Sequence, residues 1–218
     1  MQKIAIIDYG GSNLRSVFKA LDKVAGRKAK VIVSSDTKEI TRADKIVFPG
    51  QGAIGECMNQ LHRAGLDNAI KEFCKFRPFL GICLGFQSLM ANSEEDNGTR
   101  CLGIIDGSVQ RFQKTIGLAD REISARKIPH MGWNNVFWKK VHPLIRGISS
   151  ETRFYFVHSY FVRPSDPNLI IGETNYLTRF SSSIGFENIF ATQFHPEKSS
   201  SAGLKMLGNF IQWNGNDY

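Results

Sequence analysis

The feature that most constrains this chain is the stretch 78–90, in which a short apolar run leads into Gly-x-Cys-x-Gly. The apolar residues 79–82 predict a buried strand, and the residues after Cys83 predict a helix. A strand, a sharp turn and a helix around a nucleophile form a nucleophile elbow, here with Cys in place of Ser. Gly81 and Gly85 flank Cys83 at positions where the turn brings backbone segments so close that a Cβ atom would clash. The stretch therefore predicts an α/β fold with Cys83 at the apex of the turn.

The surroundings expected for Cys83 favour a reactive sulfur. A helix that begins directly after it points free N–H groups and the positive end of its dipole at the sulfur, which favours the thiolate over the thiol. The alternative is that Cys83 is only a small buried residue, the commoner role of an isolated cysteine at a strand end. The elbow alone leaves both interpretations open.

A second stretch, residues 192–199, supplies the partners that a thiolate nucleophile needs. It contains His195 and, two residues later, Glu197. A nucleophilic sulfur requires a nearby base and proton donor, and that base requires a third group to fix its ring orientation and tautomer. We therefore predict that folding brings Cys83, His195 and Glu197 together as a catalytic triad.

The length and composition bound the domain organisation. The chain has 218 residues, 42% of them hydrophobic, which is enough for a sizeable core, so we expect one large α/β domain over residues 1–218. The first residues lack the long apolar region of a signal peptide, and no apolar run approaches the roughly 18 residues of a membrane span. We expect a cytoplasmic protein that binds no membrane.

The cysteines argue against metal and disulfide chemistry. The four of them, Cys57, Cys74, Cys83 and Cys101, include no close-spaced pair of the kind that binds zinc. In a chain without an export signal they are expected to be free thiols. We expect no metal site.

The formal charge of +8 raises the question of nucleic-acid binding. The basic residues are scattered, and the densest groups, at 27–30 and 139–140, lie beside strand-like runs as solvated flanks do. We therefore expect no nucleic-acid partner. An acidic partner or a phosphorylated metabolite is the better use of this charge.

The first half of the chain alternates strands and helices. Residues 3–8, 30–33 and 45–48 are apolar runs typical of strands buried in a parallel sheet. No Gly-x-Gly-x-x-Gly follows the first run, so a dinucleotide site is not expected. Residues 66–76 are expected to form a helix before the strand that leads to Cys83, and strand-like segments dominate from residue 103 to 183. The predicted fold class is α/β, with an open, mostly parallel central sheet, helices on both faces and a β-rich second half.

A loop with two glycines, Pro49-Gly50-Gln51-Gly52, follows the third of these strands. At the carboxyl end of a central strand, such a loop lets backbone N–H groups face a ligand without obstruction by side chains. It is a candidate oxyanion or substrate loop. The alternative is an ordinary turn between a strand and a helix.

Three segments, 49–52, 81–87 and 195–197, resemble the signatures of the class I (triad) glutamine amidotransferases in their order and spacing. The resemblance covers nearly the whole chain and implies that family's flavodoxin-like fold. Within the family, the chain is similar to glutaminase subunits that serve histidine biosynthesis together with a (β/α)8-barrel cyclase. The segments that carry this further similarity are 7–16, 127–134 and 157–160. Paralogous subunits that supply ammonia for the amidation of surface sugars are a second interpretation.

The resemblance implies hydrolysis of glutamine to glutamate, with the ammonia passed to the cyclase inside a heterodimer and without a cofactor. It implies that Cys83 attacks the side-chain amide and forms a thioester, that His195 protonates the leaving ammonia and then activates water, and that Glu197 holds the imidazole. The positions implied for the oxyanion and the substrate are Gly50, Gln51, Gly52, Leu84, Gln87, Glu95, Ser159 and Tyr160. The positions implied for the partner interface are Asn13, His130, Met131 and Trp133.

Two positions depart from the family's usual pattern. Gln51 stands where the oxyanion loop more often has Val, and Phe86 stands where Met is common. The family's behaviour implies that the 50–51 peptide flips to build the oxyanion hole, so a longer polar side chain at position 51 changes how easily it does so. Two other functions remain to be weighed, a stand-alone Cys hydrolase or protease and a non-catalytic scaffold for the barrel partner.

Overall fold

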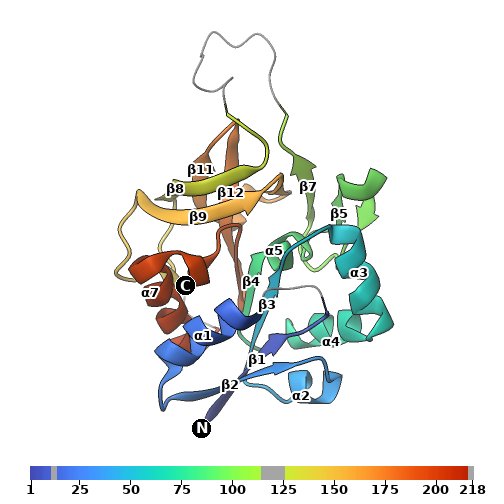
Figure 1. The fold of residues 1–218 in the computed structure, drawn as a ribbon, viewed down its shortest axis with the longest axis vertical. Helices are drawn as coiled ribbons and strands as arrows, with labels where there is room; N and C mark the ends of the chain where they lie inside the picture. Colours follow the sequence, from blue (N-terminus) through green and yellow to red (C-terminus); the bar gives the residue numbers. More distant parts are fainter. Residues whose placement is uncertain (11–13, 114–125, 216–218) are drawn as a thin grey trace.

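A computed structural model describes residues 1–10, 14–113 and 126–215 of the chain (Figure 1). Its centre is a run of parallel strands in the order β2-β1-β3-β4-β13. Their bounds are β1 (Gln2–Ile7), β2 (Ala29–Ser34), β3 (Lys45–Gly50), β4 (Phe79–Cys83) and β13 (Ile189–Thr192). These strands are mostly buried because helices cover both of their faces, which is why their sequences are continuous apolar runs.

Two hydrophobic clusters lie on opposite faces of this sheet. On one face, α1 (Leu14–Ala25) and α7 (Ser200–Gln212) pack side by side (Figure 1). On the other, α3 (Ile54–Arg63) and α4 (Leu66–Phe73) bury their apolar faces. The remaining short helices are α2 (Thr37–Thr41), α5 (Leu84–Gln87), η1 (Glu95–Asn97), η2 (Pro143–Ile145), η3 (Pro167–Leu169) and η4 (Pro196–Lys198). The predicted α/β class with helices on both faces is confirmed.

The second half is rich in strands, as predicted, and these extend the sheet mainly by antiparallel pairing. The extension joins the parallel part where β12 pairs antiparallel with β13. Its strands are β5 (Asn92–Ser93), β6 (Thr99–Arg100), β7 (Gly107–Arg111), β8 (His130–Trp138), β9 (Thr152–His158), β10 (Tyr160–Pro164), β11 (Ile170–Asn175) and β12 (Arg179–Phe186). β8 and β9 form an antiparallel pair that lies over the carboxyl ends of the parallel strands (Figure 1).

Two predicted boundaries were wrong, and one predicted helix is short. The helix expected over 66–76 ends at Phe73, because the chain must extend before Pro78, which disfavours helical backbone in the residue that precedes it. The strand expected over 45–48 continues to Gly50, since Gly50 pairs in register with Cys83 on β4. The helix expected after Cys83 is the single turn α5, which lies fully buried.

A buried lysine links the start of β3 to the end of the last helix. Lys45 is only 2% exposed, and its Nζ donates to the carbonyls of Phe210 and Ile211 at 2.8 Å each and also to that of Trp213. Burial lowers the pKa of Lys45 to about 8, and the charge of Asp44 opposes the shift. The carbonyls at the end of a helix have no partners within it, so this ammonium serves as their cap.

Among the described residues, no helix has both the length and the apolar character that crossing a bilayer requires.

Candidate functional site

The backbone at Cys83 has the strained geometry of a nucleophile elbow. Cys83 lies at the end of β4 with φ 54° and ψ −104°, a conformation that residues with a side chain rarely adopt. Such strain typically costs about 1–3 kcal/mol and persists only where the surrounding packing imposes it. A Cβ atom at Gly85 would lie 1.8 Å from the Phe48 carbonyl oxygen, and one at Gly81 would lie 3.2 Å from the Gly85 carbonyl oxygen. The predicted clash is confirmed at Gly85, whereas at Gly81 the space for a Cβ is tight but not closed.

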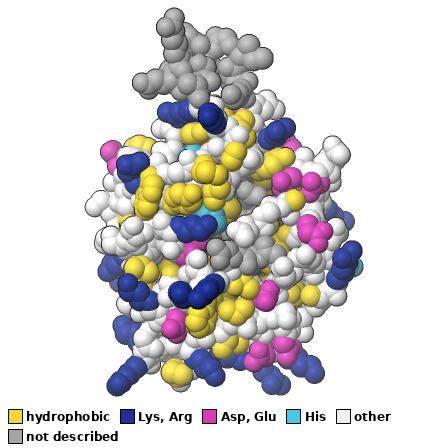
Figure 2. All heavy atoms as spheres, viewed as in Figure 1, with side chains coloured by type: hydrophobic (Ala, Val, Ile, Leu, Met, Phe, Trp, Pro, Cys, Tyr) yellow, Lys and Arg dark blue, Asp and Glu magenta, His cyan; other side chains and the backbone are white. Residues whose placement is uncertain are grey.

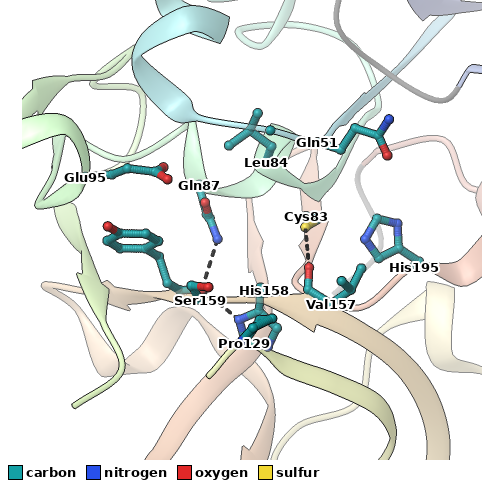
Figure 3. Close-up of a pocket in the computed structure, with 12 residues that line it drawn as sticks. Gln51, Cys83, Leu84, Gln87, Glu95, Pro129, Val157, His158, Ser159 and His195 are labelled. Atoms are coloured by element: carbon teal, nitrogen blue, oxygen red, sulfur yellow. Dashed lines mark hydrogen bonds between the residues drawn. The ribbon is translucent and has the colours of Figure 1, made fainter. Parts of the chain in front are cut away.

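The sulfur of Cys83 lies at the wall of a cavity. Its Sγ accepts a hydrogen bond from Gln193 Nε2 at 3.5 Å and lies 4.0 Å from the Val157 carbonyl oxygen (Figure 3). Only 6% of Cys83 is exposed, and the sulfur-bearing residue lines this cavity. The sulfur thus accepts a hydrogen bond from Gln193 and borders the cavity.

His195 and Glu197 approach Cys83 from the segment that follows β13. Because β13 pairs in parallel with β4, the chain beyond both strands emerges at the same edge of the sheet. His195 Nδ1 lies 2.8 Å from Glu197 Oε1, and both side chains are buried. The His195 Nε2 atom has no hydrogen-bond partner among the described residues, and its ring lies beside Cys83 (Figure 3).

The charge state of His195 follows from these neighbours. Burial by itself lowers the pKa of His195, but the charge of Cys83 and the hydrogen-bonded, charged Glu197 carboxylate outweigh it. Together they raise the pKa of His195 to about 10. His195 is therefore an imidazolium at neutral pH, with Nε2–H available to donate a proton on the cavity side.

The cavity has a volume of about 320 Å³, enough for a ligand the size of an amino acid. Gln51 and His195 lie at the end near Cys83, and Gln87 and Glu95 lie at the other end (Figure 3). The residues that line it are Gln51, Gly52, Cys83, Leu84, Gln87, Glu95, Pro129, Val157, His158, Ser159, Tyr160 and His195. Gly50 lies just beneath, where an added Cβ would be 2.8 Å from both Leu84 Cβ and Tyr9 Oη.

Two polar side chains define the end of the cavity away from the sulfur. Gln87 Nε2 donates to the Tyr160 carbonyl at 3.0 Å and to Gln193 Oε1 at 3.2 Å, which fixes the orientation of its amide. Glu95 Oε2 accepts from the Ile54 N–H at 3.0 Å. Burial raises the pKa of Glu95, the Ile54 hydrogen bond opposes this, and Asp96 adds to it.

The residues expected at the partner interface divide into two groups. Met131 and Trp133 are 63% and 43% exposed and project from the same face of β8. His130 is buried on the other face of that strand, where its Nδ1 lies 2.9 Å from His158 Nε2. Asn13 lies outside the described residues.

Within the described ranges, no group of three or more His, Cys, Asp or Glu residues is arranged to bind a metal ion. Each of the four cysteines is a buried free thiol.

Sequence reasoning missed Gln193, the side chain that contacts the sulfur. Gln193 is fully buried and donates to Cys83 while it accepts from Gln87. Its position two residues before His195 was a usable signal, because alternate residues of an extended segment face the same side. Pro129 also lines the cavity without having been singled out.

Comparisons with known proteins agree with this geometry. Residues 5–213 match the family model for class-I glutamine amidotransferases. The chain is 49% identical over 215 residues to the imidazole glycerol phosphate synthase subunit HisH of Nitrosococcus oceani, covering 99% of each sequence. It is 52% identical to the subunit of the same name from Aromatoleum aromaticum, covering 98% of this chain and 99% of that one.

Solved structures share the fold at lower identity. A putative GMP synthase subunit from Thermoplasma acidophilum has a TM-score of 0.69 and 22% identity, covering 97% of this chain and 93% of that one. The glutaminase domain of Trypanosoma brucei CTPS, solved with bound acivicin, has a TM-score of 0.63 and 16% identity, covering 100% of this chain and 96% of that one. At these identities the structures support the fold alone.

Proposed function

The chain belongs to the class-I glutamine amidotransferase family, and from this we propose that it is the glutaminase subunit of imidazole glycerol phosphate synthase, an enzyme of histidine biosynthesis. The identity of 49–52% to HisH subunits over nearly the full length supports this assignment. The observation that carries the chemistry is the meeting of Cys83 and His195 at one cavity, with Glu197 hydrogen-bonded to the His195 ring.

The first step is attack on the side-chain amide of glutamine. The Cys83 thiolate forms a bond to the amide carbon, and the π electrons of the carbonyl move onto its oxygen. We assign the stabilisation of this oxyanion to the N–H of Leu84 and an N–H from the 50–52 loop, since Leu84, Gln51 and Gly52 line the cavity together with Cys83. Each such donor typically contributes about 3 kcal/mol to the transition state.

The intermediate then collapses with loss of ammonia. The C–N bond breaks while His195 Nε2–H gives its proton to the leaving nitrogen, which yields ammonia and a γ-glutamyl thioester on Cys83. The neutral His195 next takes a proton from water as the water oxygen attacks the thioester carbon. Cleavage of the C–S bond leaves the thiolate beside the imidazolium and releases the side-chain carboxylic acid, which loses its proton to solvent and becomes glutamate.

The far end of the cavity suits the amino-acid head group of glutamine. Its α-ammonium carries a positive charge that Glu95 complements, and its α-carboxylate requires hydrogen-bond donors. Gln87 and the backbone of Ser159 and Tyr160 border the same space. We assign binding of the substrate head group to Gly52, Gln87, Glu95, Ser159 and Tyr160.

The ammonia is consumed by a partner subunit. The relatives are named as subunits of a synthase, which supports a second chain, and we propose that this is a (β/α)8-barrel cyclase bound as a heterodimer. Met131 and Trp133 are exposed apolar side chains on β8, which lies over the carboxyl edge of the sheet and suits such a contact (Figure 1).

The test separates the two half-reactions. Cys83→Ala, in complex with the cyclase, is expected to lose all synthesis of imidazole glycerol phosphate that depends on glutamine and to retain synthesis from added ammonium salts. Both rates are measured by product formation, with the wild-type complex as the control. Glutamine-dependent synthesis by Cys83→Ala, or loss of both activities from a correctly assembled complex, would contradict the proposal.

A further inference from the structure

A chain of hydrogen bonds runs from β8 to the wall of the cavity. Asn134 Nδ2 lies 3.2 Å from His130 Nε2, His130 Nδ1 lies 2.9 Å from His158 Nε2, and His158 Nδ1 lies 2.7 Å from the Tyr160 carbonyl oxygen. His130 and His158 are directly opposed in the register of β8 and β9, so the backbone pairing itself places the two rings together.

The two ends of this chain determine where every proton lies. Asn134 Nδ2 also donates to the Asn175 carbonyl at 3.0 Å, and Asn134 Oδ1 accepts from the Asn135 N–H at 2.8 Å. The Asn134 amide is therefore fixed by two backbone groups, with its nitrogen toward His130. At the other end, the Tyr160 carbonyl can only accept.

One assignment of protons satisfies all of these contacts. Because Asn134 donates, His130 Nε2 accepts, so the proton of His130 is on Nδ1. The His130 Nδ1–H donates a hydrogen bond to His158 Nε2, so the proton of His158 is also on Nδ1. The His158 Nδ1–H in turn donates to the Tyr160 carbonyl. Both rings are neutral, and all donors point from Asn134 toward the cavity.

The surroundings of the pair favour the neutral rings. His130 stacks on Tyr176 with ring centroids 4.0 Å apart, and His158 packs against Phe112 and Phe180. Burial lowers the pKa of His130 to about 4, with a further contribution from the charge of Arg126. Burial lowers the pKa of His158 to about 3, with contributions from His130 and His195 and an opposing one from the Tyr160 hydrogen bond. Among the described residues, the charged or titratable groups outside the pair that act on it are thus Arg126 and His195.

Further hydrogen bonds link the Tyr160 carbonyl to the sulfur. We call the whole series, from Asn134 to Cys83, the relay. The Tyr160 carbonyl oxygen accepts one hydrogen bond from His158 Nδ1 and another from Gln87 Nε2. Gln87 in turn donates to Gln193, and Gln193 donates to Cys83 Sγ. A strand whose opposite face exposes Met131 and Trp133 is therefore joined to the nucleophile through consecutive polar contacts.

We propose that Asn134, His130 and His158 are positioning residues for the glutaminase reaction, which fix the Tyr160 carbonyl and, through it, the Gln87 amide at the substrate end of the cavity. This rests on the proposed function. The three side chains touch neither the sulfur nor, in this assignment, the bond that is cleaved. Their effect falls on glutamine binding, because Tyr160 and Gln87 border the head-group end of the cavity.

Asn134→Asp tests the proposal with almost no change of shape. The carboxylate cannot donate to His130 Nε2, so His130 must either take a second proton or turn its single proton toward Asp and accept from His158 instead. At low pH the second proton preserves the direction of the relay. At high pH the direction reverses, and His158 presents an acceptor to the Tyr160 carbonyl.

The expected result is a pH-dependent KM. For the complex with the cyclase, the glutamine KM of Asn134→Asp is expected to equal the wild-type value near pH 6 and to exceed it by up to about tenfold near pH 9, the effect of one lost hydrogen bond. The kcat is expected to change less than KM. The matched control is Asn135→Asp, which adds the same charge at the next position but takes part in the relay only through its backbone N–H.

A second measurement addresses the protons directly. In the wild-type chain, the nitrogen NMR shifts of both imidazoles are expected to show neutral rings protonated on Nδ1. An Nε2–H tautomer or an imidazolium at either residue at pH 7 would overturn the proposal. A ratio of mutant to wild-type KM that stays flat with pH, or one that Asn135→Asp reproduces, would also overturn it. Absence of glutamine hydrolysis by the wild-type complex would instead refute the proposed function, while the NMR result would still test the relay.

Discussion

Cys83 differs from the other three cysteines in ways that determine its reactivity. Burial raises the pKa of Cys57 to about 11 and that of Cys101 to about 12, and it also raises the pKa of Cys74. Thiols with such values stay protonated and are poor nucleophiles at neutral pH. Cys83, by contrast, lines the cavity beside the imidazolium of His195.

A glutamine-mimicking electrophile is therefore expected to label Cys83 and to spare Cys57, Cys74 and Cys101. Peptide mass spectrometry after partial labelling at pH 7 measures the extent at each site, and Cys83→Ser serves as the control. Equal labelling at a second cysteine, or no Cys83 adduct, would favour a scaffold over an enzyme.

Glu197→Gln is expected to lower the pKa of His195, because it removes the carboxylate charge that stabilises the imidazolium. In comparable triads, the loss of this carboxylate lowers turnover by about 10⁴-fold, and we expect at least a 100-fold loss here. The pH profile of kcat/KM for glutamine is the measurement. The alkaline limb of this profile is expected to move to lower pH in the variant. An unchanged alkaline limb would contradict the role given to the Glu197 carboxylate.

The same pKa shift has a consequence for stability. The pKa of His195 is 6.5 before folding and about 10 in the folded protein. The stabilisation of the His195 imidazolium by Cys83 and Glu197 therefore contributes fully to the stability of the fold below pH 6.5. This contribution is lost as the pH rises through about 10.

At the scale of the elements, α7 positions the triad through its first turns. Gly203 lies against the segment that carries Glu197, and a Cβ at this position would be 1.8 Å from the Pro196 carbonyl oxygen. Neither η4 nor α7 can shift freely at this contact, because backbone meets backbone. The position of Glu197 is thus set partly by a glycine six residues further along the chain.

Gly203→Ala is expected to destabilise the protein by about 1–3 kcal/mol, the usual range for overpacking, and to reduce turnover by displacing Glu197. Gly208→Ala is the matched control on the same helix, since a Cβ there meets no atom within 4 Å. That change is expected to stabilise the protein by roughly 0.5–1 kcal/mol because alanine favours the helix. Chemical denaturation measures both, and equal effects would contradict the packing argument.

Local chemistry explains what could be predicted from the sequence at this scale. The elbow, the glycines beside Cys83 and the parallel strands each follow from short patterns, because steric and burial requirements act on neighbouring residues. The pairing of β13 with β4 and the register that opposes His130 to His158 depend on distant segments, so no local pattern specifies them. The donor role of Gln193 at the sulfur was missed for the same reason, since it requires Cys83 to be adjacent in space.

At the scale of the whole molecule, charge and apolar surface are distributed differently. Lys and Arg side chains are spread over the face seen in Figure 2 and do not form one continuous basic patch. Trp133 and Met131, in contrast, are large apolar side chains exposed two positions apart on one strand. Large exposed aromatic residues of this kind are frequent anchors of protein interfaces.

Trp133→Ala is expected to weaken binding of the cyclase by at least about tenfold, and up to several hundredfold if Trp133 is an interface hot spot. Phe76→Ala is the control, because Phe76 is 80% exposed but precedes β4 and so lies at the opposite, amino edge of the parallel strands. Titration calorimetry with the purified cyclase measures both affinities. Comparable losses for the two variants would place the partner elsewhere.

The ammonium of Lys45 makes the order of synthesis matter for this protein. Its three acceptors belong to residues 210, 211 and 213, more than 160 positions downstream. Until the ribosome has released that last turn, the strand leading to Gly50 would have to hold an unpaired cation in an apolar interior, a penalty of several kcal/mol. β3 therefore acquires its final packing only once residues 210–213 have joined the fold, so the end of the last helix anchors the strand that leads into the 50–52 loop.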